Sequence, residues 1–187
     1  MFDLMSELEA AFLVNSLGLF RNQVDRGRAT PRGNVNLVRA YTAKDFYRGI
    51  GGTEDLLHLI GHADSSTLQT GDGKSLVTAE ELERRAAKGT LKIPEIVVCT
   101  NCKFQSFPWR SALKAAGVKV LIASSKNVTP ANLTAFDMSF YSALLSQVRR
   151  GTSTVDRVEA SFKLANKYYK AIHAVGTQYA PFALERL

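Results

Sequence analysis

Two reactive side chains each follow an apolar segment of the chain. His62 comes shortly after the run Asp55–Ile60, and Cys102 follows the run Glu95–Cys99. In an open parallel sheet, reacting groups gather at the carboxyl ends of the strands. Consecutive parallel strands are often neighbours, about 4.8 Å apart, so the two side chains are expected to face each other across a small gap. A cysteine beside a histidine is a nucleophile with its base, and this pair suits acyl transfer.

Other residues of the same types have ordinary structural interpretations. Cys99 lies inside its apolar run and is assigned to core packing, and His58 is expected to pack beneath the site. The segment Gly73–Ser75 (GKS) lacks the earlier glycine of a phosphate-binding loop, because Leu68 occupies that position. Gly49–Gly52 lies between a predicted helix and a predicted strand, which is the reverse of the dinucleotide-binding order. Nucleotide binding is therefore not predicted.

Strand-like and helix-like segments alternate along the chain, and the predicted strands are apolar. The strands are predicted at Ala11–Asn15, Val35–Tyr41, Asp55–Ile60, Glu95–Cys99 and Val118–Ala123. The helices are predicted at Leu19–Val24, Ala43–Gly49, Thr78–Lys88, Arg110–Ala116, Thr129 onwards and Ser153–Ile172. Asp25–Asn34 and Ser65–Ser75 are predicted loops. This order is typical of a mostly parallel sheet with helices on both faces.

Local signals predict where the helices begin and end and which faces they bury. Thr42 with Asp45, and Thr78 with Glu81, predict capping boxes. Glycines that follow the helical segments predict their ends, at Gly117 and Gly151 among others. The last two helices each carry one apolar face: Leu133, Phe136, Phe140, Leu144 and Val148, then Val155, Val158, Phe162, Ala165, Tyr169 and Ile172.

Composition and charge narrow the class of protein. The chain has 187 residues, of which 45% are apolar and 22% charged, and this predicts one globular domain over 1–187. No apolar run approaches the roughly 20 residues of a membrane span, and no secretory signal is predicted. The two cysteines give no disulfide framework, which favours a reducing, cytoplasmic compartment. The net charge of +7 would suit nucleic acid, but Arg21–Arg32 lacks the interleaved aromatic residues of a nucleic-acid arm.

Four segments carry a resemblance to a known family. They are Leu57–His62 (LHLIGH), Val97–Cys102 (VVCTNC), Ala115–Ser124 (AAGVKVLIAS) and Phe136–Leu144, which reads F-x-x-x-F-Y-x-x-L. In this order they resemble the CHAT group of caspase-like cysteine peptidases, over roughly residues 36 to 169. The resemblance implies one caspase-like domain, an α/β three-layer sandwich with a mostly parallel sheet.

The resemblance also implies a role for each site residue. His62 is the expected catalytic histidine and Cys102 the expected nucleophile. The backbone N–H groups of Ala63 and Cys102 are the expected oxyanion hole. The substrate pocket is expected at Asp64, Thr100, Ser125 and Lys126.

Three positions depart from the family pattern. Ala63 stands where glycine or serine is usual, and Lys126 stands where a tryptophan commonly lines the pocket. Thr100 stands where relatives that cut after lysine or arginine have an aspartate. This marker therefore does not predict cleavage after a basic residue.

The resulting hypothesis is a cysteine endopeptidase that cleaves a protein or peptide through His62 and Cys102, with no cofactor, no metal and no membrane association. A partner protein or sensor module is a candidate activator. The short connection Lys103–Gly117 predicts an active form that is uncut in this region. Two other classes stay open: a catalytically inactive caspase-like adaptor and, less favoured, a basic α/β domain that binds nucleic acid.

Overall fold

The computed structural model describes residues 38–146, 153–172 and 182–187. Within these residues the chain forms two compact units, one containing 38–128 and 182–187 and the other containing 129–146 and 153–172. Each unit is described by itself. The strand, helix and loop predicted before residue 35, and the predicted helix end at Gly151, lie outside the described residues. The single-domain expectation stays a prediction.

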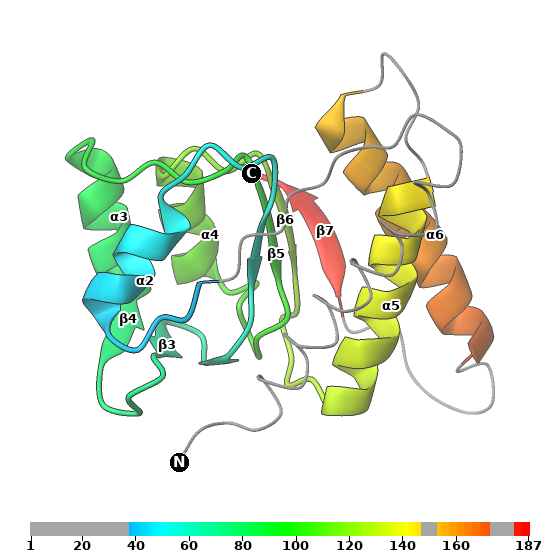
Figure 1. Ribbon diagram of the computed structural model, residues 1–187, viewed down its shortest axis with the longest axis horizontal. Coiled ribbons are helices and arrows are strands. Elements are labelled where there is room, and N and C mark those ends of the chain that lie inside the picture. Colours follow the sequence, from blue (N-terminus) through cyan, green and yellow to red (C-terminus); the bar gives the residue numbers. More distant parts are fainter. Residues whose placement is uncertain (1–37, 147–152, 173–181) are drawn as a thin grey trace. The chain divides into compact units, whose positions relative to one another are not determined.

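A four-stranded sheet organises the first unit (Figure 1). Its strands are β1 (Leu57–Leu59), β5 (Ile96–Cys99), β6 (Val120–Ala123) and β7 (Ala183–Arg186), in the spatial order β1-β5-β6-β7. β1, β5 and β6 run parallel, whereas β7 pairs with β6 antiparallel. The predicted α/β class is confirmed, and the sheet is mixed. The strand β7 was not predicted.

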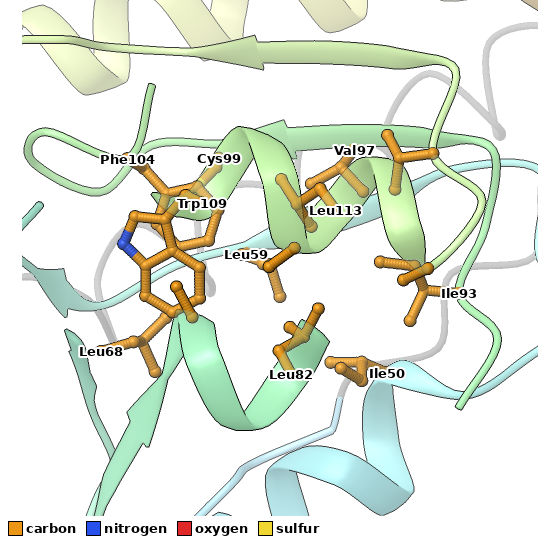
Figure 2. Packing of buried hydrophobic residues seen from close by; sticks show 14 of the residues in the cluster. Ile50, Leu59, Leu68, Leu82, Ile93, Val97, Cys99, Phe104, Trp109 and Leu113 are labelled. Atoms are coloured by element: carbon orange, nitrogen blue, oxygen red, sulfur yellow. The ribbon is translucent and has the colours of Figure 1, made fainter. Parts of the chain in front are cut away.

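Every residue of β5 and β6 is buried, as their unbroken apolar sequences predicted. Because side chains alternate across a strand, Val97, Cys99 and Leu121 share one face and join the main apolar core. That core also contains Leu82 of helix α3 (Ala79–Ala87) and Leu113 of helix α4 (Phe107–Ala115) (Figure 2).

A second sheet lies where the sequence predicted a loop. It has the order β2-β3-β4, with β2 at His62–Ala63, β3 at Thr67–Gln69 and β4 at Leu76–Thr78, all antiparallel. The predicted loop Ser65–Ser75 is therefore wrong over β3. Leu68 of β3 pairs with Val77 of β4, and both side chains are buried in the core. A single apolar residue among polar neighbours gave too weak an alternation to predict this strand.

The helices of the first unit begin at capping residues, two of which were predicted. In α2 (Ala43–Ile50), Thr42 and Asp45 form the complete capping box. In α3 (Ala79–Ala87), the Thr78 hydroxyl accepts the Glu81 N–H, which is one half of the predicted capping box. The Glu81 carboxylate binds Arg84 and Arg85, at 2.6 and 2.7 Å, and these ion pairs lie along the exposed side of the helix.

Helix α4 spans Phe107–Ala115 and begins three residues before the predicted start at Arg110. Pro108 stands in its first turn, where a missing N–H leaves no helical bond unmade. Its end at Gly117, with φ of +93°, was predicted. Trp109 of this helix is fully buried and stacks on Phe104, with ring centroids 4.3 Å apart (Figure 2).

The strand predicted at Val35–Tyr41 is not present in its described part, residues 38–41. This segment instead accepts two backbone hydrogen bonds from the turn after β3. The N–H groups of Gly71 and Asp72 donate to the carbonyl groups of Ala40 and Tyr41. Two isolated bonds hold the segment without forming a ladder.

The second unit contains two long helices, α5 (Pro130–Ser146) and α6 (Thr154–Ile172) (Figure 1). They pack through the predicted apolar faces, with Phe136 and Phe140 of α5 buried and Phe162 of α6 against Phe136 at 6.1 Å. The Tyr169 hydroxyl donates to Asn132 Oδ1 at 2.6 Å and joins the two helices. Among the described residues, no helix is long and apolar enough to cross a membrane.

Candidate functional site

The candidate site lies where β1 and β5 end side by side. Their parallel register pairs Leu57 with Val97 and Leu59 with Cys99. One further bond, from the Thr100 N–H to the Leu59 carbonyl at 3.1 Å, continues the pairing beyond the ladder. His62 follows the end of β1 by three residues, and Cys102 follows the end of β5 by three residues. The predicted adjacency of these two strand ends is therefore present in the first unit.

Gly61 changes the chain direction directly before His62. Its φ of +155° is one that glycine adopts readily and other residues rarely do. A Cβ atom placed on Gly61 would lie 3.9 Å from Asn101 Nδ2, so the chain still runs beside the end of β5 at this point. The turn leads into β2, where the His62 side chain is exposed to solvent.

Cys102 is partly buried, and its sulfur lies against the backbone of Val128. The Val128 N–H donates to Sγ at 3.5 Å, and Sγ lies 4.0 Å from the Val128 carbonyl oxygen. Cys99, by contrast, is fully buried in the core, in agreement with its predicted packing role.

Residues 100–106 form the segment that we call the Cys102 loop. It is bonded to the segment after β6, because Lys103 N–H donates to the Lys126 carbonyl and Gln105 N–H donates to that of Ser124. Lys103 has φ of +53°, the one positive φ outside glycine among the described residues. A non-glycine residue in this conformation stores strain, and such residues cluster at functional sites.

The predicted pocket residues fall into two groups. Ser125 and Lys126 are exposed, and the backbone of Lys126 contacts the residue that follows Cys102. Thr100 is only 2% exposed, and its hydroxyl lies 3.4 Å from the Leu59 carbonyl and 3.2 Å from His58 Nε2. Thr100 therefore supports the site from within rather than facing a substrate.

The Asp64 carboxylate closes its own turn. It accepts the N–H groups of Ser66 and Thr67, each at 2.7 Å, and the Thr67 hydroxyl at 2.8 Å. These bonds hold the pKa of Asp64 below its usual value, with the Ser66 N–H as the largest cause. Its oxygens are thus engaged in shaping the loop after Ala63.

Two side chains from the start of α4 fasten this same loop. The Trp109 indole N–H donates to the Asp64 carbonyl at 3.0 Å, and the Ser106 hydroxyl donates to the Ser65 carbonyl. The segment that follows His62 is therefore tied to the segment that follows Cys102. The sequence signal for this tie was that Trp109 is the single tryptophan of the chain, but its role was not predicted.

Ala63, whose N–H is a predicted oxyanion donor, belongs to β2. The Asp64 N–H donates to Thr67 in β3, and bonds alternate along an antiparallel ladder. The Ala63 N–H therefore points away from β3. It points toward the outer edge of the three-stranded sheet, since β2 is an edge strand of that sheet among the described residues. Within the described residues, no backbone acceptor is bonded to the Cys102 N–H either.

His58 belongs to the interior beneath the site. Its ring is partly shielded by β1 and β5, and burial lowers its pKa to about 3, so it is neutral near pH 7. An Nε2–H donated to the Thr100 hydroxyl at 3.2 Å suits a chain of bonds that ends on the Leu59 carbonyl. This geometry agrees with the predicted structural role of His58.

The remaining features concern metals and known relatives. No group of three or more His, Cys, Asp or Glu residues that could hold a metal ion occurs in the described part of the chain. Comparison with protein-family models and with curated proteins found no match.

Proposed function

We propose that the chain is a cysteine endopeptidase in which Cys102 is the nucleophile and His62 its base. The observation that carries this proposal is the parallel register of β1 and β5, which places side by side the two strand ends that precede His62 and Cys102. Two further features support it. The Val128 N–H donates to the Cys102 sulfur at 3.5 Å, and the Ala63 N–H points to the outer edge of its sheet.

In the proposed reaction, His62 takes the proton of the Cys102 thiol, and the thiolate attacks the carbonyl carbon of a peptide bond. The N–H groups of Ala63 and Cys102 stabilise the oxyanion that forms. His62 then returns its proton to the leaving amine as the C–N bond breaks, which leaves a thioester on Cys102. Water, deprotonated by His62, attacks the thioester and releases the carboxylate product and the thiol.

The proposal includes a caspase-like three-layer sandwich and a protein or peptide as substrate. The CHAT-like order of motifs and the parallel strands β1, β5 and β6 support this architecture. The connection from Lys103 to Gly117 holds α4 and the bonded Cys102 loop, which leaves little accessible chain for an activating cut. Activation by a partner or sensor module is therefore the proposed route.

The test is labelling of the chain by peptides that carry a thiol-reactive group, read by intact mass. We expect one label on the wild type and none on Cys102→Ala, and Cys102→Ala should lower peptide cleavage by more than about 10³-fold. Cys99→Ala is the matched control, because it removes the other cysteine and costs about 1 kcal/mol through a small cavity while keeping activity.

Three results would count against the proposal. Cleavage that persists in Cys102→Ala would exclude the dyad. A folded wild type that neither cleaves a peptide library nor takes a peptide label would favour a catalytically inactive adaptor. Salt-sensitive retention on nucleic acid would favour a basic α/β domain that binds nucleic acid.

A further inference from the structure

Asn101, the residue directly before Cys102, has a fully buried side chain with an exposed fraction of 0%. Neither its Nδ2 nor its Oδ1 has a hydrogen-bond partner among the residues that the structure describes. An amide that loses its water without gaining a partner destabilises the folded state, and native proteins retain few such groups. Each such group in a folded protein calls for an explanation, and this one lies directly beside Cys102.

The other buried polar side chains at these strand ends are paired. The Thr100 hydroxyl lies within hydrogen-bond distance of the Leu59 carbonyl, and the Ser124 hydroxyl bonds the Lys126 backbone at 3.1 Å. The unpaired amide is thus a property of Asn101 and not of this end of the sheet in general.

The position of the Asn101 amide connects the two members of the proposed dyad. Its Nδ2 lies 3.9 Å from where a Cβ on Gly61 would be, so it lies against the turn that carries His62. Its backbone leads directly to Cys102. A conformational change in this turn therefore alters the surroundings of the amide. Conversely, a hydrogen bond of the amide can stabilise one conformation of the turn over another.

We infer that Asn101 is a positioning residue of the proposed peptidase site: its buried amide gains hydrogen bonds with the Gly61–His62 turn when the His62 imidazole meets the Cys102 thiol. The inference rests on the proposed function. Because the amide is unpaired in the resting arrangement, pairing it stabilises the reactive arrangement selectively. Asn101 does not touch the substrate in this role.

The test measures kcat, KM and the thermal midpoint of the full chain, with a fluorogenic peptide selected by wild-type cleavage of a peptide library. Asn101→Leu should lower kcat about 10–100-fold, because small misplacements of a catalytic group have effects of this size. KM should stay within about 2-fold, since the interaction is made only in the reacting state. The thermal midpoint should stay or rise, because the buried unpaired amide is gone. Asn101→Ala, which cannot overfill the site, should lose kcat in the same way.

The matched control is Thr70→Val, because Thr70 is also buried but has a paired hydroxyl, bonded to Asp72 and to the Ser75 carbonyl. It should show the reverse pattern, a lower midpoint with unchanged kcat. An Asn101→Leu protein with wild-type kcat and a lower midpoint would make Asn101 an ordinary structural residue and overturn the inference alone. A wild type without Cys102-dependent cleavage would overturn the proposed function and this inference together.

Discussion

The Cys102 loop and the turn between β3 and β4 are both short segments of the first unit, and they differ in how their polar side chains are hydrogen-bonded. We call residues 70–75 the Asp72 turn. In this turn the Asp72 carboxylate accepts the N–H groups of Lys74 and Ser75 and the hydroxyls of Thr70 and Ser75, at 2.6 to 3.0 Å. The positive φ, +67°, falls on Gly73, which adopts it without strain.

The Cys102 loop differs from the Asp72 turn both in the residue that has positive φ and in the pairing of its polar side chains. Its positive φ falls on Lys103, and its buried amide, on Asn101, is unpaired among the described residues. Local sequence rules would place a glycine at position 103 and an apolar residue at position 101. Departures of this kind are expected at functional sites, where the surrounding structure stabilises an arrangement that folding alone would not select. The comparison therefore favours the Cys102 loop over the Asp72 turn as a candidate functional segment.

The largest expected effect comes from His62, the proposed base for Cys102. His62→Ala should lower kcat/KM about 10²–10⁴-fold, because the thiol loses its base and the leaving amine its acid. His58→Gln is the matched control in the neighbouring strand, and its rate should stay within a few-fold of the wild type. Steady-state cleavage of the selected peptide measures both. A reversal, with His58 essential and His62 dispensable, would move the site into the interior.

The His58 control carries a pH dependence of its own. Its folded pKa of about 3 lies below the ordinary value of 6.5, so it contributes stability that is complete above pH 6.5 and lost as the pH falls toward 3. Thermal midpoints of the wild type should therefore fall across this window, and His58→Gln should fall less steeply. Equal slopes would mean that the folded protein protonates His58 freely.

The next effect concerns how the Cys102 loop is fastened. Trp109→Ala should destabilise the first unit by about 3–5 kcal/mol, because it removes a buried ring that stacks on Phe104. Trp109→Phe keeps most of that packing but loses the bond to the Asp64 carbonyl, at about 1–3 kcal/mol. Urea titrations measure both values. If Trp109→Phe costs nothing, the indole bond does not hold the loops together.

A smaller effect is expected at the Asp72 turn. Hydrogen bonds from Ser75 and Lys74 hold the pKa of Asp72 well below its ordinary value of 3.8. A lowered folded pKa contributes stability that is present above pH 3.8 and lost as the pH falls below it. Asp72→Asn should therefore lower the thermal midpoint near pH 7 and flatten its fall in acid, while the cleavage rate near pH 7 stays unchanged. Loss of cleavage in this variant would bring the turn into the site.

The smallest effect compares the two positive φ positions directly. Lys103→Gly should change the free energy of unfolding by less than about 1 kcal/mol, because relief of strain is offset by the greater freedom of glycine in the unfolded chain. Gly73→Ala should cost about 1 kcal/mol from strain alone, since its Cβ would meet only Gln69 Nε2, at 3.7 Å. If Lys103→Gly keeps stability but lowers kcat, the strained lysine serves the site.

The elements that depend on short-range signals could be predicted from the sequence. The apolar runs of β5 and β6 predicted fully buried strands, and Thr42, Thr78 and Gly117 predicted helix ends that the structure confirms. These features succeed because caps and strand burial depend on residues within a few positions of one another. The adjacency of β1 and β5 was predicted from a topological rule, that consecutive parallel strands are often neighbours, and their register confirms it.

The strands and hydrogen bonds that depend on partners distant in the sequence could not be predicted and were seen first in the structure. β3 and β7 exist because β4 and β6 complete their ladders, and neither strand has a sequence pattern strong enough to predict it. The Trp109 bond to Asp64 and the Val128 bond to Cys102 join residues far apart in the chain, and each uses a backbone group that every residue possesses. A sequence pattern distinguishes side chains, and it therefore cannot tell which backbone donor or carbonyl the fold will bring to the site.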